Sequence, residues 1–280
     1  MKALREGAVR LNGAKASPSD RLAEGDAVSA PWALEAARPP TGYGASRSGV
    51  SERLGLRTLY RGGGLWCVDK PAGLLSQPDS AGGDSLVTRA WAELEWGRID
   101  FRPAVIGRLD RNVSGVSAIA LDAPALRALS SLMRDGRIKK IYRALARGET
   151  PPEGEITVPL LKDGRRNFVR AASAGEAGME ALTRFRRLGY DGRHSLVELE
   201  LVTGRPHQAR AHMSFLGFPI VGDFKYGDRT NRNAEGVPLC LHAFSLSFPD
   251  VPGLPEPIRG LTVVSPLPRS FSVFKNSGKR

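Results

Sequence analysis

The sequence predicts an α+β fold in which a large, mainly antiparallel sheet is flanked by a few helices. Apolar stretches typical of strands recur along the chain, helical patterns are scattered between them, and no regular strand–helix alternation is present. Hydrophobic residues make up 41% and charged residues 25% of the 280 residues, which is a globular composition. A disordered chain is therefore excluded.

Residues 1–30 are expected to form a small α/β appendage to this sheet. A short helical piece ends at Gly7, and Asn12-Gly13 follows alternating residues, which is a strong signal of a hairpin turn. Gly25 then turns the chain into another short strand. A segment this short cannot bury a core alone. We therefore expect this segment either to pack against the rest of the chain or to be an incomplete module.

Residues 31–60 are predicted to be a linker, and residues 61–280 to be the main domain. The segment around Pro39-Pro40, Gly42 and Gly44 has few bulky apolar residues, which is typical of linkers and surface loops. In the main domain, Leu65 to Val68 forms a short apolar strand, and Ser85 caps an amphipathic helix that continues to Trp96.

Four further elements follow in the main domain. A buried strand is predicted over 115–121, and Asp122 with Pro124 then starts a helix that Gly136 ends. A strand covers 141–146, and the alternation over 194–202 is typical of a half-buried strand. The last helix runs over 207–216 and ends before a glycine.

The charge and the cysteine content narrow the choice of partner and compartment. The formal net charge is +12, which favours a polyanionic partner because neutralised phosphates release counterions. An Arg-rich solvated surface would give the same charge, so both explanations stay open. No run of about 18 apolar residues is present, so no membrane span is expected. Cys67 and Cys240 alone cannot form a disulfide framework, and a reducing cytoplasm fits.

Asp110 is the first candidate for chemistry. It lies between Arg108 and Arg111 in a predicted loop directly before the buried strand. Nearby cations favour the ionised carboxylate, and loops held by a rigid strand commonly carry catalytic side chains. Taken alone, an Asp that caps a turn is the more frequent explanation of such a pattern.

A second cluster of polar residues surrounds the start of the last helix. Arg205 and Arg210, together with the helix N-terminus, would hold a phosphate or orient a carboxylate. His207 and His212 are five residues apart, so they project roughly 140° from each other on a helix. Metal-binding pairs need a spacing of three or four residues, so no metal is expected here.

Five segments, which follow one another along the chain in the same order as in the family, resemble the RluA-type pseudouridine synthases. GRLDRNVSGVSAIALD is similar to the family's H-R-L-D-x-x-T-S-G signature, and LVTGRPHQARAHMSFLGFPIVGDFKYG to its long second signature. LWCVDKPAGLLSQP, KKIYRALARG and LCLHAFSLSFP are similar to its V-x-K-P-x-G, K-x-Y-x-A and L-H-A segments. In residues 1–30, VRLNG and LAEGDAV resemble the back part of a small RNA-binding module that is shared with a ribosomal small-subunit protein.

This resemblance implies a role for each of several residues. Asp110 would be the essential carboxylate, either as the nucleophile at the sugar or as the base that opens the glycosidic bond. Arg210 would pair with Asp110, and Tyr142 would lie against the uracil face. RNA contacts are expected from Arg108, which would occupy the space left by the flipped base, and from Arg111, Lys140, Arg205, His207 and Gln208.

The function implied by the resemblance is isomerisation of specific uridines in structured RNA to pseudouridine, after the base is flipped out of its stack. Ribosomal RNA is expected as substrate rather than transfer RNA, with a monomeric protein in the cytoplasm and no cofactor, because the isomerisation consumes nothing. Two alternatives are a catalytically silent RNA-binding protein of the same fold and a hydrolase that uses Asp110 and His207. The presence of Asp110, Tyr142 and Arg210 favours the isomerase.

Three positions depart from the family's pattern. Gly107 and Val113 replace the usual His and Thr of the first signature, and Pro206 replaces the usual Thr of the second. All three lie in loops around the expected site. We expect them to affect which RNA is selected rather than the reaction itself.

Overall fold

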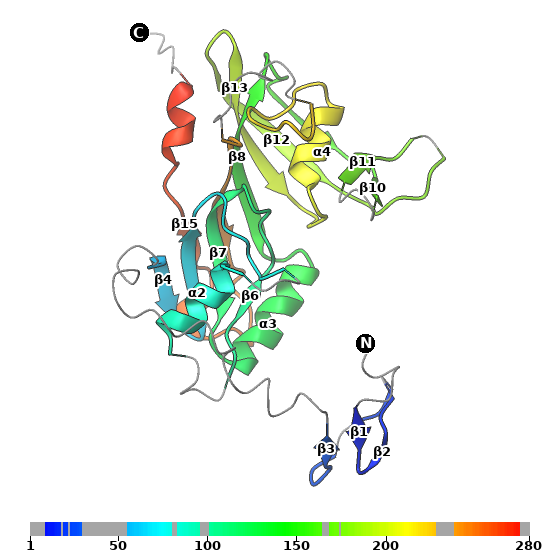
Figure 1. Ribbon diagram of the computed structural model, residues 1–280. Helices are drawn as coiled ribbons and strands as arrows, with labels where there is room; N and C mark the ends of the chain where they lie inside the picture. The colour runs from blue at the N-terminus through cyan, green and yellow to red at the C-terminus, as the bar shows by residue number, and fades with distance from the viewer. Residues whose placement is uncertain are drawn as a thin grey trace.

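The computed structural model describes residues 9–17, 19–21, 23–29, 55–79, 83–95, 101–163, 168–173, 175–227 and 238–274. Within these ranges, ten strands form one mixed sheet, and a few helices pack beside it (Figure 1). Almost all pairs of neighbouring strands are antiparallel. The predicted α+β class with a large, mainly antiparallel sheet is confirmed. No helix among the described residues is long and apolar enough to cross a membrane.

The large sheet runs through eight strands in a single path, and two shorter strands pair beside it. In spatial order the path is β4 (Arg57–Gly62), β5 (Leu65–Lys70), β7 (Ser114–Ala120), β14 (Leu241–Ser247), β8 (Lys139–Arg147), β13 (His194–Leu201), β12 (Thr183–Tyr190) and β9 (Glu153–Ile156). The side strands are β6 (Ala104–Ile106) on β7 and β15 (Thr262–Val264) on β14. The predicted strands at 65–68, 115–121, 141–146 and 194–202 are all present. β4 begins at Arg57, so the expected linker boundary at residue 60 falls inside a strand.

The centre of the sheet is fixed where β14 lies beside β7. This is the one parallel pair among the named strands that the structure describes, with His242 opposite Ser114. Their side chains hydrogen-bond at 2.9 Å between Oγ and Nδ1. Gly115 has a φ of 115°, and a Cβ there would lie 2.2 Å from the Ala243 carbonyl oxygen. Glycine is therefore required where the loop that carries Asp110 enters the sheet.

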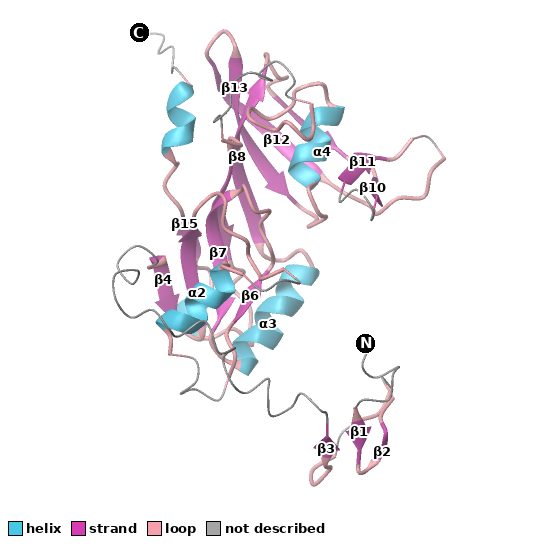
Figure 2. Cartoon of the chain, in the orientation of Figure 1, coloured by secondary structure: helices cyan, strands magenta, loops and turns pink. Residues whose placement is uncertain are grey.

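Helices cover both faces of the half of the sheet that contains β5 and β7. Leu65 and Cys67 pack in one cluster with α3 (Ala123–Arg134), whereas Trp66 and Val68 pack in another with α2 (Leu86–Glu93). Successive side chains of a strand point to opposite faces, so burial of both faces explains the uninterrupted apolar run of β5. On the other half, α4 (Gln208–Phe215) packs on β8 and β13 (Figure 2).

The helix starts follow the predicted capping residues. The Ser85 side chain accepts from the Thr88 amide and the Asp122 side chain from the Ala125 amide, as expected of N-caps. The α2 helix ends at Glu93, and the predicted extension to Trp96 reaches residues outside those described. The described part of the chain also contains a hairpin of β10 (Leu160–Asp163) and β11 (Phe168–Ala171) and the 3-10 helices η4 (Glu256–Ile258) and η5 (Arg269–Val273).

Near the N-terminus, β1 (Arg10–Leu11), β2 (Ala14–Lys15) and β3 (Val28–Ser29) form a separate three-stranded sheet. Asn12 and Gly13 have φ values of 50° and 83°, so the predicted hairpin turn is confirmed. The Asn12 side chain also accepts from the Ala27 amide, which ties the turn to β3. The helical piece expected to end at Gly7 lies outside the described residues.

Candidate active site

An open cavity of about 780 Å³ lies between the two halves of the large sheet. Its walls come from segments that are far apart in the sequence: 75–79, 108–113, 204–210 and 222–225, together with Tyr142 of β8. Tyr142 packs against the hydrophobic clusters of both halves, as Leu109 does. The junction of the two cores therefore forms the base of the cavity, and loops form its rim.

Asp110 lies in this cavity on the loop between β6 and β7. The turn is closed by the backbone, since the Val113 amide donates to the Asp110 carbonyl at 3.1 Å. The carboxylate instead accepts a hydrogen bond from Arg210, with 2.9 Å between Nη1 and Oδ2. The Asp110 side chain is 26% exposed. These contacts favour a functional carboxylate over the alternative of a turn-capping Asp.

Arg210 divides its guanidinium between two carboxylates. Nη1 faces Asp110, while Nε and Nη2 bind the buried Asp223 carboxylate at 2.8 and 2.9 Å. Burial opposes the charge of Arg210, but its hydrogen bonds with Asp223 and Asp110 outweigh burial and raise its pKa. Arg210 is therefore a permanent cation whose orientation is fixed from the side opposite Asp110.

Tyr226 supports the same guanidinium from one face. Its ring centroid lies 4.9 Å from the Arg210 Cζ atom and stacks on Phe168 of β11 at 4.8 Å. Its hydroxyl accepts from the Val169 amide and hydrogen-bonds His207 Nδ1 at 2.8 Å. Burial raises the pKa of Tyr226 to about 12, so this phenol stays protonated near neutral pH. The β10–β11 hairpin is thereby attached to the site.

His207 lies just before α4 rather than inside it. Its φ is 53°, so the helix begins at Gln208 and the expectation of helix from 207 is corrected by one residue. The left-handed backbone turns the side chain into the cavity, where Nε2 lies 3.8 Å from Asp110 Oδ2. Burial lowers the pKa of His207, although the charge of Asp110 opposes that shift. The neutral imidazole is thus favoured beside the carboxylate.

His212 belongs to a different environment from His207. Its ring nitrogens hydrogen-bond the Thr183 hydroxyl and the Val158 carbonyl, both at 2.9 Å, and the side chain is fully buried. Within the described ranges, no group of three or more His, Cys, Asp or Glu residues is arranged to hold a metal ion.

The residues expected to contact RNA fall into two groups. Arg108, Arg111, Arg205 and His207 line the cavity, and the first two are exposed at its rim. Lys140 is buried, with 7% of its surface exposed, and does not line the cavity; burial lowers its pKa. The residues that line the cavity are therefore placed where RNA can reach them, whereas Lys140 is not.

Gln208 lines the cavity but uses its whole side-chain amide inside the protein. Its oxygen accepts from the Thr203 hydroxyl and the Arg205 amide, and its nitrogen donates to Leu182 and Thr183. Only 2% of the residue is exposed. The expected RNA contact is therefore replaced by a positioning role, in which Gln208 fixes the turn that carries Arg205 and His207.

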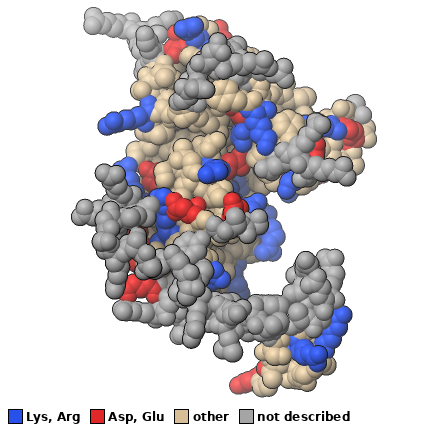
Figure 3. All heavy atoms as spheres, in the orientation of Figure 1, with Lys and Arg blue, Asp and Glu red and all other residues tan. Residues whose placement is uncertain are grey.

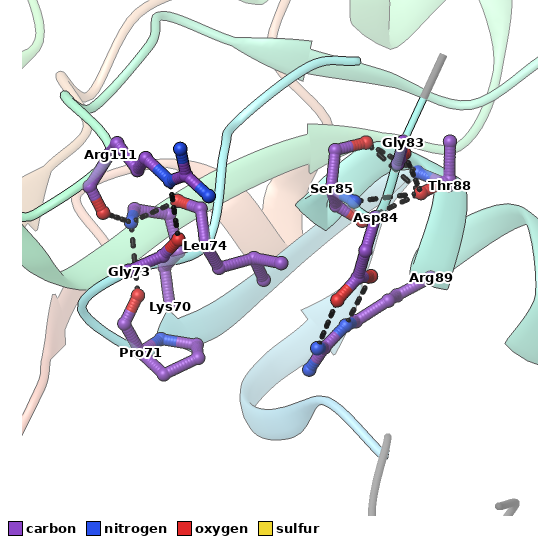
Figure 4. A network of polar contacts seen from close by, with 10 residues as sticks. All are labelled: Lys70, Pro71, Gly73, Leu74, Gly83, Asp84, Ser85, Thr88, Arg89 and Arg111. Atoms are coloured by element: carbon purple, nitrogen blue, oxygen red, sulfur yellow. Dashed lines mark hydrogen bonds and ion pairs between the residues drawn. The ribbon is translucent and has the colours of Figure 1, made fainter. Parts of the chain in front are cut away.

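Lys70 fixes the loop of Asp110 through hydrogen bonds to backbone carbonyls. No role was predicted for it from the sequence. Its fully buried ammonium donates to the carbonyls of Pro71, Leu74 and Arg111 (Figure 4). Arg111 and Gly73 exchange two further hydrogen bonds. The signal was available, because a Lys directly after an apolar strand and before Pro stands in the quoted VDKPAG segment. All three donors of the ammonium are satisfied, so the loop is fixed to the end of β5.

A second contact fixes the same loop from the side of α2. The Ser76 hydroxyl donates to the Leu109 carbonyl and accepts from the Leu109 amide. Ser76 follows Leu75, whose carbonyl accepts from the Leu86 amide at the start of α2. Beside this point, Ser85 and Thr88 form the capping box of α2 (Figure 4). Leu109, the residue before Asp110, is thus bound by Ser76, and the residue next to Ser76 is bonded to the start of α2.

The chain matches the model of the family described as RNA pseudouridylate synthase over residues 64–215. It belongs to this family. It is 32% identical over 196 residues to a ribosomal large subunit pseudouridine synthase D of Borreliella burgdorferi, covering 68% of this chain and 60% of that protein. It is 32% identical to a ribosomal large subunit pseudouridine synthase C of Pasteurella multocida, covering 88% of this chain and 76% of the relative.

Solved structures of the pseudouridylate synthase family agree with the fold. The human RNA pseudouridylate synthase domain containing 4 matches with a TM-score of 0.62 and 25% identity, over 77% of this chain and 90% of that one. The human domain containing 1 matches with a TM-score of 0.63 and 26% identity, over 79% and 86%. The matched family region begins after the small N-terminal sheet, so the resemblance of residues 1–30 to an RNA-binding module stays a prediction.

The departures from the pseudouridylate synthase signature are accommodated locally. Gly107 has a φ of 74°, which glycine adopts without strain, and a Cβ there would meet the Met133 side chain at 3.3 Å. Val113 is 3% exposed and packs in the core beneath α4. Pro206 is exposed on the rim. None of the three disturbs the contact between Asp110 and Arg210.

We expect Asp223→Asn to lower the free energy of unfolding by about 3 kcal/mol, because the variant leaves the buried Arg210 cation with one carboxylate. Urea denaturation at pH 7 measures the loss. Glu256→Gln is the matched control, since Glu256 pairs with Arg259 but is 85% exposed, and its removal should change stability little. Equal losses for the two variants would contradict a special role for Asp223.

The buried ammonium of Lys70 predicts a pH dependence of stability. Burial lowers the pKa of Lys70 from 10.5 to about 8, so the unfolded chain binds more protons between these values. The stability of the wild type relative to Lys70→Met should therefore rise with pH from about 8 to 10.5, by at most about 1.4 kcal/mol per pH unit.

Chemical denaturation at several pH values, from 7 to 10.5, checks this expectation. Lys139→Met is the control, because the Lys139 side chain is 56% exposed and its ammonium lies 3.9 Å from Glu200 at the surface. The rise with pH should be specific to Lys70→Met. A Lys70→Met difference that does not change with pH, or that changes no more than that of Lys139→Met, would show that the Lys70 ammonium is not desolvated in the folded protein.

Proposed function

We propose that this protein is an RNA pseudouridine synthase that isomerises specific uridines in structured ribosomal RNA, with Asp110 as the essential carboxylate. The observation that carries the proposal is the hydrogen bond of 2.9 Å between Arg210 and Asp110 inside a cavity that Tyr142 also lines. These are the three residues to which the family resemblance assigns the chemistry. The chain spans 60% of the length of the Borreliella burgdorferi relative, so the activity of the whole protein is part of the proposal.

The site is suited to an isomerisation that needs no co-reactant. The bond between the ribose C1′ and uracil N1 breaks, the uracil turns, and a bond forms between C1′ and C5. The hydrogen on C5 leaves as a proton, and N1 gains a proton, so atoms and electrons balance. Asp110 acts either as the nucleophile at the sugar or as the base that opens the glycosidic bond, and in both cases the hydrogen bond from Arg210 orients its carboxylate.

The other residues of the cavity hold the base and the RNA. Tyr142 lies against the uracil and excludes water while the detached base turns. The target uridine must leave its stack first, which costs a few kcal/mol, and the planar cation of Arg108 fills the space that it leaves. Arg111 and Arg205 on the rim bind phosphates. A net charge of +12 supports binding to a polyanion.

Ribosomal RNA is the substrate that the comparisons favour. Two of the relatives described above are named as synthases of the ribosomal large subunit. The proposal therefore assigns this chain a uridine in large-subunit ribosomal RNA, with the protein acting as a monomer in the cytoplasm. A catalytically silent RNA-binding protein remains the alternative. It would bind the same RNA but would not isomerise any uridine.

Asp110→Asn should abolish isomerisation while RNA affinity stays within several-fold of the wild type, because phosphate contacts dominate binding. Pseudouridines are mapped in ribosomal RNA from a strain that lacks this protein and from the same strain supplied with each variant. The wild type should restore one or more missing pseudouridines, and Asp110→Asn none.

Asp135→Asn is the matched control for this substitution, because Asp135 is exposed at the end of α3 and does not line the cavity. It should restore modification fully. A deletion strain with an unchanged pseudouridine map in both ribosomal and transfer RNA would contradict the proposed activity. Restoration by Asp110→Asn would remove Asp110 from its role.

The small N-terminal sheet is proposed to add RNA contacts. Figure 3 shows Lys and Arg side chains on this unit as well as on the main body. Arg10, Lys15 and Arg21 are exposed on it. A sheet whose only role was to cover the hydrophobic core of the main domain would not need three exposed cations.

Replacing Arg10, Lys15 and Arg21 together with Gln should weaken RNA binding and flatten its salt dependence. Each lost phosphate contact removes about 0.7–0.9 from the slope of log affinity against log salt concentration. Titrations of wild type and variant with ribosomal RNA at several salt concentrations measure the slopes. An unchanged slope would show that the N-terminal sheet does not touch RNA.

A further inference from the structure

Phe224 is an exposed aromatic residue on the rim of the cavity. It lines the cavity, yet 50% of it is exposed, and among the described residues it belongs to none of the hydrophobic clusters. The described exposed residues that line the same cavity include the cations Arg108, Arg111 and Lys225, together with Asp79 and Pro206, and among them Phe224 is the only aromatic ring. Packing therefore gives no reason for an aromatic ring at this position.

The backbone on both sides of Phe224 is held rigidly. Gly222 has a φ of 78°, and a Cβ there would lie 2.3 Å from the Pro238 carbonyl oxygen. Asp223 is 1% exposed and binds Arg210 through both carboxylate oxygens. Tyr226 is 5% exposed, stacks on Phe168, and donates its amide to the Asp223 side chain. The Phe224 ring is thus presented from a segment in which Asp223 and Tyr226 point inward and are held by hydrogen bonds.

We propose that Phe224 is a stacking platform for a nucleobase that flanks the target uridine. This inference rests on the proposed function and deepens it, because it assigns a contact for the RNA outside the reacting nucleotide. A base offers a flat π-face to the ring, while the cations beside it suit the phosphates on either side. Stacking on a fixed ring also costs little ordering on the protein side.

A nucleobase fits this position better than an apolar protein partner. An interface with a protein needs a contiguous apolar patch, whereas Phe224 is a single ring among charged rim residues. The ring also lines the cavity that would hold the flipped uridine, which places it within reach of a nucleotide that flanks that uridine on this side. Stacking tolerates different bases, and we therefore expect Phe224 to position the strand rather than to read its sequence.

Substitutions of Phe224 test the proposal on one defined RNA. The probe is a transcript of the ribosomal RNA segment that contains the uridine identified by the mapping experiment. Phe224→Ala should raise KM about tenfold and leave kcat within about threefold, because the lost contact is outside the reacting nucleotide. Phe224→Trp should retain a low KM, and Phe224→Leu should behave like Phe224→Ala.

Phe215→Ala is the matched control. Phe215 is 55% exposed at the end of α4 and does not line the cavity, so the control removes an equally exposed ring from another place. Its KM and kcat should equal those of the wild type. A rise of KM in this variant that matches Phe224→Ala would show a general effect of lost surface rings and would overturn the proposal.

A base-deleted substrate tests stacking directly. Transcripts with a single abasic nucleotide on either side of the target uridine are compared for wild type and Phe224→Ala. At one position the abasic change should raise the KM of the wild type about tenfold and leave that of Phe224→Ala unchanged, since the contact is already lost. Full, independent effects at both positions would overturn the proposal, as would a Phe224→Leu variant with the wild-type KM.

Binding assays separate failure of this inference from failure of the proposed function. If the wild type isomerises nothing in the mapped RNA, the activity is wrong, and the dissociation constants of the same transcripts are measured instead. Phe224→Ala should still weaken binding about tenfold, with the same loss of sensitivity to the abasic nucleotide. Equal affinities of wild type and Phe224→Ala would overturn the stacking platform irrespective of catalysis.

Discussion

The site depends on one guanidinium that is shared by two carboxylates. Arg210 binds Asp223 with Nε and Nη2 and Asp110 with Nη1, which joins residues 100 positions apart in the sequence. A cation that is 12% exposed is stable in such a place only if its partners are fixed and its donors are used. The neutral form of His207, favoured by burial, avoids adding a second positive charge. The site therefore holds the Asp110 carboxylate against a fixed cation while leaving it partly exposed to the cavity.

The other side of this contact is held by hydrogen bonds to backbone groups of the Asp110 loop and of the segment before it. Lys70 uses its ammonium on three carbonyls, and Ser76 holds both backbone groups of Leu109. The loop then enters the sheet at Gly115, where no side chain fits against β14. Residues that carry chemistry need their supporting contacts fixed to a fraction of an ångström. Here the support comes from both halves of the sheet, so Asp110 and Arg210 meet although the cavity between the halves is open.

Local signals in the sequence predicted the local features of the fold. Asp122, Ser85 and the Asn12-Gly13 turn lie where their capping and turn chemistry placed them, because each acts within three residues of itself. Burial depends on partners that are distant in sequence, so Gln208 was expected to contact RNA, whereas its side chain is buried and bonded within the protein. Asp223, Tyr226 and Lys70 stood in quoted motifs without a role for the same reason. The parallel pairing of β14 with β7 carries no local signal.

The segment 222–226 joins the rim of the cavity to the contact between Arg210 and Asp110, because it carries both inward-pointing and exposed side chains. Asp223 and Tyr226 point inward to Arg210, whereas Phe224 and Lys225 lie exposed on the cavity rim. A force on the Phe224 ring is therefore resisted by the same hydrogen bonds that orient Arg210 towards Asp110. On the proposed stacking of RNA on Phe224, an RNA that fits only by moving this ring would strain these bonds. The proposal therefore links selection of the substrate to the orientation of Asp110 through a single short segment.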